Sequence, residues 1–415
     1  MHHKIILSRY PDYLKKFQCI GPLCSDNCCI GWDVDIDKKT YFKYQKVTNE
    51  ALMPLFRKYV HQSRDAYSDD VDFARVKLLK DKRCPFLNAE NLCRIQATIG
   101  ESYLSNVCAT YPRFTNQVDD CYEYSATVSC PEAARLILLN KQGLVFVEEA
   151  TKPVERTMLM YQVDTTMPGQ NRMVTNLISL RQFSMSLLQN RAYGLAERLM
   201  ILGYFFNELQ NQAFKSKTNE ILALISNYTE RIRLKDFHAI LATTPLKTAE
   251  QMKLMGGIAK SLNVQDEIDS RDFIAFTEEF RKGIFMAKAS SSSNNPSLRY
   301  EESYRDYYAP FMEKQGYILE NFLVNYVFSS LFPAGESTRP FDAFSLLAVR
   351  FALIKYYLIG IGASRRGLSS KLTVAFIQSF AKAIEHHKTF LEGIPAHLKR
   401  ERHNTLTDIL LLLKN

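Results

Sequence analysis

The chain has 415 residues, of which 46% are hydrophobic and 23% charged, a composition typical of a globular protein with ample material for a core. Its 16 glycines and 14 prolines are too few for a collagen-like or low-complexity chain. The net charge of +9 is modest for this length. It slightly favours an acidic partner or substrate and does not indicate nucleic acid.

Neither a membrane span nor a secretory leader is predicted. The most apolar stretch, residues 344–361, contains Arg350 and Lys355, so it falls short of the roughly 18 uncharged apolar residues that a spanning helix needs. The N-terminus has no long apolar segment and no small-residue cleavage site. We therefore expect no membrane insertion and a cytoplasmic location.

The cysteines are the most informative feature, because all nine lie in the first third of the chain. They are Cys19, Cys24, Cys28, Cys29, Cys84, Cys93, Cys108, Cys121 and Cys130. The short spacing from Cys19 to Cys29 would let one loop present several thiolates to one centre, which favours metal or cluster ligation. Two alternatives remain: buried reduced thiols that pack as small hydrophobes, and disulfides, which need an oxidising compartment.

The sequence favours an iron–sulfur cluster over zinc. Both centres accept four thiolates. The pairs Cys84-Pro85 and Cys130-Pro131, however, resemble the Cys-Pro that ends bacterial ferredoxin cluster motifs. The C-x3-C-x2-C triplet of radical enzymes is absent, because Cys29 directly follows Cys28. Radical cleavage of S-adenosylmethionine is therefore not predicted.

The cysteines belong to an irregular Cys-rich module, expected at residues 1–135. Alternating apolar and acidic residues at 31–37 predict a short strand, and residues 38–59 predict one helix. Residues 95–111 look helical in their first part. Pro131 and the following glutamate suit the first turn of a new helix.

The remainder, residues 136–415, is expected to be α-helical, which makes the fold mainly α. From about residue 171, leucine and phenylalanine recur at three- and four-residue steps. The predicted helices include 304–332 and 341–361. The Ser/Asn-rich segment 289–297 predicts a loop, most simply a connector.

One glycine-rich segment, residues 360–367, superficially resembles a nucleotide-binding loop. Such a loop has to follow a strand, whereas the residues before Gly360 predict a helix. We therefore interpret the segment as a helix stop with glycine at the C-terminal cap.

Several motifs together resemble the bacterial flagellin lysine-N-methylase family. They are Cys19-x4-Cys24-x3-Cys28-Cys29-x2-Trp32, Cys84-Pro85-Phe86-Leu87 with Cys93, Leu104-Ser105-x2-Cys108-x2-Tyr111-Pro112-Arg113, and Ser129-Cys130-Pro131-Glu132-Ala133. Weaker blocks follow at Asn190-Arg191-x5-Glu197-Arg198-Leu199 and Glu320-Asn321-x3-Asn325-Tyr326-Val327-Phe328-x3-Phe332-Pro333. The Cys-rich part also resembles a broader zinc- or iron-chelating domain family.

The resemblance implies methyl transfer from S-adenosylmethionine to lysine side chains of flagellin in the bacterial cytoplasm. It also implies eight motif cysteines, here Cys19, Cys24, Cys28, Cys29, Cys84, Cys93, Cys108 and Cys130, with Cys121 outside the motifs. One tetranuclear cluster uses about four thiolates, so eight fit two sites or one site with a supporting shell.

No catalytic base and no cofactor-binding residue can be assigned from the sequence. Asp33, Asp35 and Asp37 could meet a cationic lysine, although a solvated strand face is the simpler interpretation. Arg113 could hold a carboxylate or form a structural ion pair. The alternative to a methyltransferase is a non-enzymatic metal- or iron–sulfur-binding adaptor, or a redox protein.

Overall fold

The computed structural model divides into two compact units. The first unit contains residues 1–133 and 146–162, and the second contains residues 134–145 and 163–415. The chain thus changes units near the expected boundary at residue 135, but residues 146–162 return to the first unit. The described residues are 5–66, 68–154, 156–213, 218–261, 270–286, 295–385 and 388–414.

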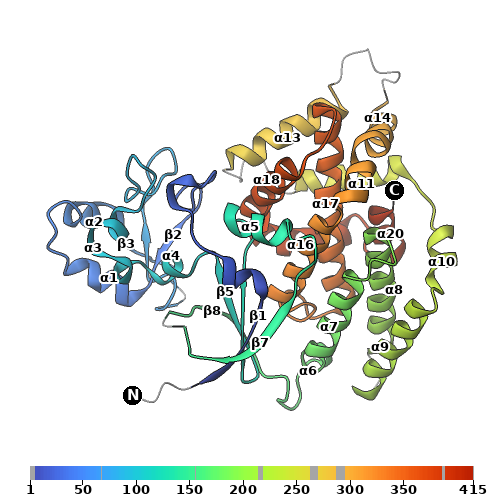
Figure 1. Ribbon diagram of the computed structural model, residues 1–415, viewed down its shortest axis with the longest axis horizontal. Helices are drawn as coiled ribbons and strands as arrows, with labels where there is room; N and C mark the ends of the chain where they lie inside the picture. The colour runs from blue at the N-terminus through green and yellow to red at the C-terminus, as the bar shows by residue number, and fades with distance from the viewer. Residues whose placement is uncertain are drawn as a thin grey trace. The chain divides into compact units, whose positions relative to one another are not determined.

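The first unit contains a five-stranded sheet with the strand order β7-β1-β6-β5-β8 (Figure 1). Strand β1 runs parallel to β6 and antiparallel to β7, while β5 and β6 form an antiparallel pair. Residues 146–162 supply β7 and nearly all of β8. The strands are β1 (Ile6–Pro11), β5 (Arg113–Val118), β6 (Cys121–Ala126), β7 (Phe146–Thr151) and β8 (Leu159–Val163).

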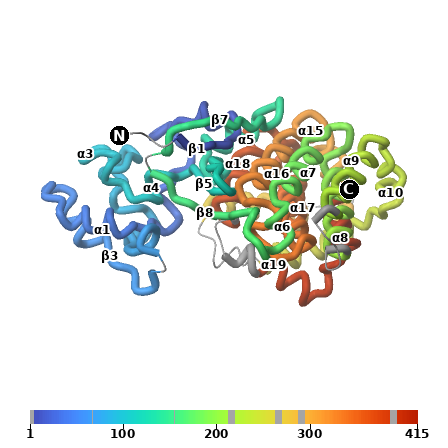
Figure 2. Tube along the Cα trace, turned by 90° about the horizontal axis from the view of Figure 1, so that it is seen from below, coloured from blue at the N-terminus to red at the C-terminus, as the bar shows by residue number. Residues whose placement is uncertain are grey.

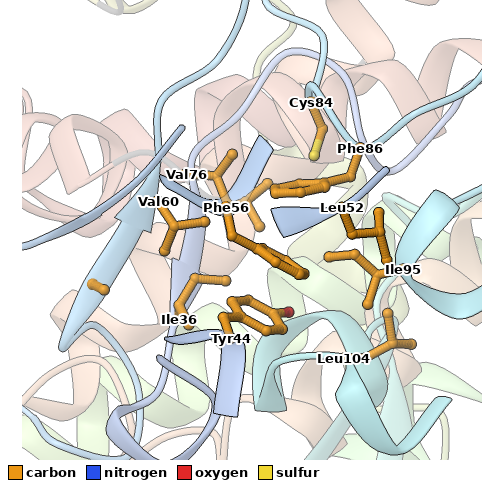
Figure 3. Packing of buried hydrophobic residues seen from close by; sticks show 12 residues of the cluster. Ile36, Tyr44, Leu52, Phe56, Val60, Val76, Cys84, Phe86, Ile95 and Leu104 are labelled. Carbon is orange, nitrogen blue, oxygen red and sulfur yellow. The ribbon is translucent and has the colours of Figure 1, made fainter. Parts of the chain in front are cut away.

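The same unit has a three-stranded sheet with its own hydrophobic core. The strands are β2 (Val34–Ile36), β3 (Val60–Gln62) and β4 (Ala74–Val76), in the order β2-β4-β3. Tyr44 stacks on Phe56 at 4.1 Å between ring centroids, and Phe56 packs on Phe86 at 5.0 Å. Figure 3 shows the Cys84 sulfur pointing toward these rings, so this core holds at least one motif cysteine.

The strand predicted at 31–37 is confirmed as β2, but the single helix predicted at 38–59 is wrong. The chain forms two helices, α1 (Lys38–Gln45) and α2 (Met53–Tyr59). The Asn49 side chain accepts hydrogen bonds from the backbone N–H groups of Ala51 and Leu52. Asparagine competes with helical hydrogen bonding in this way, which explains the break.

The second unit is α-helical, as expected, and the long helix α17 (Pro340–Arg365) is buried along most of its length among the others (Figures 1 and 2). It is the one described helix long and apolar enough for a membrane span, yet its most apolar window is fully buried inside the unit. The other helices are α6 (Arg172–Thr175), α7 (Leu177–Leu188), α8 (Leu195–Ala213), α9 (Thr218–Arg233), α10 (Phe237–Thr243), α11 (Thr248–Ser261), α13 (Arg271–Ile284), α14 (Pro296–Ser303), α15 (Ala309–Gln315), α16 (Tyr317–Ser329), α18 (Ser370–Phe380), α19 (Lys388–Arg400) and α20 (Leu406–Leu413).

Helix α5 (Pro131–Leu138) begins at the predicted proline and crosses the boundary between the units.

The predicted helix stop at 360–367 is confirmed as the place where α17 ends, but Gly360 and Gly362 lie inside the helix and a C-terminal cap is not their role. The helix continues through Gly360 to Arg365 and ends with Arg366 in the left-handed region at φ 56°. A Cβ on Gly360 would lie 2.1 Å from Phe280 Cδ2, and one on Gly283 would lie 2.1 Å from the Gly360 carbonyl oxygen. These glycines therefore allow α13 to pack closely against α17.

The helix predicted at 304–332 is three pieces: a π-helical turn at Tyr304–Tyr308, then α15 and α16. The loop predicted at 289–297 lies mostly outside the described residues, and its last residues, from Pro296, already belong to α14.

Several basic side chains of the second unit are buried. Basic and acidic residues balance in the first unit, so the net charge of +9 lies in the second. There, three buried cations donate to the carbonyl of the last residue of a helix: Arg198 to Leu188 of α7 (2.6 Å), Arg299 to Ile284 of α13 (2.9 Å) and Lys355 to Leu413 of α20 (2.8 Å). A cation at this position satisfies a carbonyl that lacks a helical partner and suits the helix dipole. These charges are internal and do not indicate an acidic partner.

Lys355 predicts a measurable pH dependence of stability. Burial lowers the pKa of Lys355 to about 7, from an ordinary value of 10.5. Between these two values the unfolded chain binds more protons than the folded one, so the free energy of unfolding should rise with pH above about 7. Lys355→Met should abolish this rise. Urea unfolding of wild type and Lys355→Met at about pH 7 and about pH 9 measures this rise. Lys253→Met, on the exposed side of α11, is the control. An equal rise in Lys355→Met and wild type would contradict the assignment.

Candidate metal centre

The eight motif cysteines all belong to the first unit, and none of the nine cysteines forms a disulfide. Cys84 is buried, Cys24, Cys29, Cys93 and Cys130 are half-buried, and Cys19, Cys28 and Cys108 are exposed. They fall into two groups according to the elements that carry them.

The inner group lies around the core of the three-stranded sheet and contains Cys29, Cys84, Cys93 and Cys108. The backbone N–H of Cys84 donates to the Cys29 carbonyl at 2.8 Å, and Cys93 forms an isolated β-bridge with Leu87. Cys93 directly precedes α3 (Arg94–Ile99), and Cys108 lies on α4 (Asn106–Thr110). Burial raises the pKa of Tyr44 in this core, and the charges of Cys108, Cys93, Asp37 and Cys84 raise it further.

The outer group contains Cys19, Cys24, Cys28 and Cys130. Burial raises the pKa of the Cys24 thiol, and the charges of Cys28 and Cys19 add to this effect. Burial likewise raises the pKa of Cys130 to about 11, with contributions from Cys24 and Cys28. Cys28 and Cys130 also act on Tyr111, whose pKa is raised mainly by burial.

An aromatic pair accompanies the outer group. The indole N–H of Trp32 donates to the Cys28 carbonyl at 2.6 Å, and its ring packs edge-on against Tyr111 at 5.2 Å. The Tyr111 hydroxyl is 3.1 Å from the Ser129 hydroxyl, directly before Cys130. The motif tyrosine and tryptophan therefore position the cysteine loops, a role that the spacing did not reveal.

Backbone N–H groups at two helix starts partly offset the effect of burial, which raises the pKa of the Cys93 and Cys130 thiols. The sulfur of Cys93 accepts backbone N–H groups of Ile95 and Gln96 in the first turn of α3, and the sulfur of Cys130 accepts those of Glu132 and Ala133 in the first turn of α5. Each hydrogen bond lowers the pKa of its thiol, against the larger effect of burial. Donors at a helix start favour the thiolate, which is the form that binds metal.

The cysteines share a region without forming a compact ligand set. Within the described part of the chain, no three Cys, His, Asp or Glu side chains come close enough together to hold a metal ion. A tetrahedral zinc site with Zn–S bonds of about 2.3 Å would bring its sulfurs to about 3.8 Å of one another. The donor chemistry fits a thiophilic centre, and a polynuclear cluster holds its thiolates farther apart than one zinc ion does.

Other candidates from the sequence have structural partners. Asp33 and Asp35 pair with Arg75, at 3.8 Å and 2.9 Å. Asp37 is buried and accepts the N–H groups of Thr40 in α1 and Asn106 in α4. The interpretation of a solvated strand face is therefore wrong for Asp37. Arg113 donates to the Ala109 carbonyl at 2.9 Å.

The two weaker motif blocks meet in one ion network in the second unit, in which Glu320 and Arg198 are buried and Arg191 is exposed. Glu320, on α16, accepts hydrogen bonds from Arg198 at 2.7 Å and Arg191 at 2.8 Å. Its neighbour Asn321 donates to the Asn140 carbonyl at 2.8 Å. These motif residues connect α16 to the α7–α8 loop and to residues 138–145, which gives them a structural role.

A second buried ion cluster uses the rest of the α16 block. The Arg350 guanidinium lies 4.1 Å from the centre of the Tyr326 ring and 3.2 Å from a Glu336 carboxylate oxygen. The Tyr326 hydroxyl donates to the other oxygen of Glu336.

Comparisons with known proteins identify the class to which the helical unit belongs. The profile of the FliB lysine N-methylase C-terminal domain matches residues 181–412, more than half of the chain. The chain therefore belongs to the lysine N-methylase family, and it is a lysine N-methyltransferase.

Particular relatives come from Salmonella. Lysine-N-methylases of Salmonella choleraesuis and Salmonella typhimurium are 20% and 19% identical over 400 residues, which cover 94% of this chain and 95% of theirs. A flagellar biosynthetic protein, FliU, of Salmonella muenchen is 28% identical over 140 residues, 34% of this chain and 81% of its own. No solved structure matches.

Proposed function

We propose that this protein transfers methyl groups from S-adenosylmethionine to lysine side chains of flagellin in the cytoplasm. The observation that carries the proposal is the family match of the helical unit, together with lysine-N-methylases that align along nearly the whole chain. The name of the third relative supports a flagellar substrate.

The chemistry sets a requirement for the protein. The pKa of lysine is about 10.4, so the acceptor amine is mostly protonated at neutral pH. The protein has to remove that proton, exclude water and hold the amine in line with the methyl carbon. When bound, S-adenosylmethionine supplies an electrophilic methyl group on a sulfonium, and an amine attacks it without radical chemistry.

The described residues offer no nucleoside site of the doubly wound kind. In the larger sheet β1 runs parallel to β6, while the β1–β7 and β5–β6 pairs are antiparallel. Gly360 and Gly362 lie inside α17, and Gly367 follows its end. A dinucleotide-type site needs a parallel sheet with a glycine-rich turn. The residues that bind S-adenosylmethionine must therefore be arranged differently.

We further propose that the eight motif cysteines hold metal, with an iron–sulfur cluster favoured and zinc the alternative. Support comes from the shared location of eight sulfur donors and from the N–H groups donated to Cys93 and Cys130. A bound cation would offset the burial and the mutual repulsion that raise the pKa of Cys84 to about 11. Because an amine nucleophile needs no radical, the centre has a structural role.

Removing a ligand cysteine should therefore remove metal and activity together. Cys24→Ala and Cys84→Ala are expected to purify with reduced metal content and to lose most methyl transfer, because the centre stabilises the first unit. Cys121→Ala is the control, since Cys121 lies on β6 outside both groups. Elemental analysis of anaerobically purified protein provides the measurement. Full metal content in both ligand variants would contradict the ligand assignment.

The methyltransferase proposal itself is tested by intact-mass spectrometry. Unmodified flagellin incubated with the protein and S-adenosylmethionine should gain mass in whole methyl steps, and should gain none without the cofactor. No gain, with soluble flagellin and metal-loaded protein, would instead favour the adaptor or redox alternative.

A further inference from the structure

Three aromatic rings come together beside the three-stranded sheet. They belong to Tyr41 and Phe42 on α1 and to Phe73, which directly precedes β4. The ring centroids lie 5.4 Å apart for Tyr41 and Phe42, 5.4 Å for Tyr41 and Phe73, and 5.9 Å for Phe42 and Phe73. Each ring therefore contacts the other two, and we call this group the aromatic patch.

The aromatic patch is packed at its base and open at its edge. Tyr41 and Phe73 are half-buried and pack against the hydrophobic core of the three-stranded sheet. Phe42, by contrast, is 50% exposed. The packed base fixes the rings in advance, which lowers the entropy cost of binding a partner. The exposed ring offers that partner an aromatic face.

An ordered acidic loop, residues 68–72, lies beside the patch. The Ser68 N–H donates to the Asp72 carboxylate at 2.9 Å, and the Asp70 N–H donates to the Ser68 hydroxyl at 3.2 Å. The backbone N–H of Lys38 donates to the Asp69 carbonyl at 2.7 Å, which fixes the loop against the start of α1. The carboxylates of Asp69 and Asp70 remain exposed.

A lysine of the chain itself shows which chemical group this surface binds. The Lys38 Nζ lies 2.8 Å from the Asp69 Oδ2 and 5.4 Å from the centre of the Phe73 ring. An ammonium is attracted both to a carboxylate and to an aromatic face. The side chains of Lys38 and Asp69 are 47% and 63% exposed, and ion pairs this exposed are weak. Another ammonium can therefore displace Lys38 at little cost.

We infer that the aromatic patch and Asp69 form a docking site for lysine side chains of the protein substrate. This inference rests on the proposed function and adds a place where the substrate is held. Charge complementarity identifies the occupant, because an anion beside aromatic faces suits a cationic side chain. In the free protein Lys38 occupies the site, and a substrate lysine replaces it.

Steady-state kinetics with flagellin tests the site, because the substitutions act in opposite directions. Phe42→Ala and Asp69→Asn should raise KM by about twofold to fivefold, the size of an exposed ammonium–aromatic contact, and leave kcat unchanged. Lys38→Met removes the competing ammonium and should lower KM. Leu79→Ala truncates an exposed apolar residue elsewhere in the first unit and is the control. Unchanged KM in Phe42→Ala and Asp69→Asn, or a raised KM in Lys38→Met, would overturn the inference.

A binding measurement separates this inference from the proposed function. A dye-labelled, lysine-bearing peptide and the same peptide with acetylated lysines would be titrated by fluorescence anisotropy without S-adenosylmethionine. Wild type should prefer the unmodified peptide, and Phe42→Ala should reduce that preference. Unfolding followed by Trp32 emission checks that the first unit of each variant is folded.

The outcomes are distinguishable. Equal binding of the two peptides by wild type would overturn the docking site, even where flagellin is methylated. A preference that Phe42→Ala reduces, in a protein that does not methylate flagellin, would support the docking site and overturn the proposed function.

Discussion

Gly283→Ala is expected to lower the free energy of unfolding of the helical unit by about 3 kcal/mol, at the upper end of the usual cost of overpacking. The new methyl group would lie 2.1 Å from the Gly360 carbonyl oxygen and 2.9 Å from the Ser364 nitrogen, both backbone atoms. Backbone cannot rotate away as a flexible side chain can, so α13 has to move off α17.

Two controls make this prediction specific. Gly256→Ala, in α11, places its Cβ no closer than 3.9 Å to the Tyr356 hydroxyl, so it should be neutral or stabilise the helix by up to about 1 kcal/mol. The only tryptophan, Trp32, reports on the first unit, while far-UV circular dichroism reports mainly on the helices. Gly283→Ala should shift the dichroism transition and leave the tryptophan transition in place. An unshifted dichroism transition would show that the helices do not cross at these glycines.

Glu320→Gln is expected to cost about 3 kcal/mol or more, because it leaves the buried Arg198 without its counter-charge. The side chains of Arg198 and Glu320 are 7% and 3% exposed. Arg198 would retain its hydrogen bonds to the carbonyls of Leu188 and Tyr193, but these do not neutralise its charge. Urea unfolding followed by circular dichroism measures the loss.

The matched control is Glu230→Gln, in an exposed pair with Arg233 on α9. Exposed pairs of this kind contribute about 0.5 kcal/mol or less, so this variant should unfold almost as wild type does. Equal effects of the two substitutions would mean that the Glu320 network is solvated, contrary to the structure.

The cysteine-rich module shows what sequence spacing can predict and where it stops. Spacing predicted ligation, because short loops and Cys-Pro pairs are local features, and the family resemblance implied the set of eight cysteines. Neither showed that Cys29 and Cys84 are joined by a backbone contact across 55 positions. The roles of Trp32 and Tyr111 likewise depend on a ring contact between separate loops.

In the helical unit, too, local sequence did not reveal the role of a glycine or the burial of three basic residues. Residues 360–367 were interpreted as a helix stop because glycine is common at C-terminal caps, and the helix does end within them. The role of Gly360 itself is decided by Phe280, on a different helix. Similarly, the net charge does not reveal that Arg198, Arg299 and Lys355 are buried at helix ends, since those carbonyls belong to distant segments. Local patterns predicted the helices, and long-range packing set their breaks and contacts.

The most direct test of the central claim is transfer of an isotope-labelled methyl group. Flagellin would be incubated with the protein and with S-adenosylmethionine carrying a deuterated methyl group, and then digested and mapped. We expect the label on lysine side chains, and none on flagellin whose lysines were acetylated beforehand. Unlabelled flagellin, with metal-loaded protein and intact cofactor recovered, would contradict the assignment of flagellin methylation to this protein.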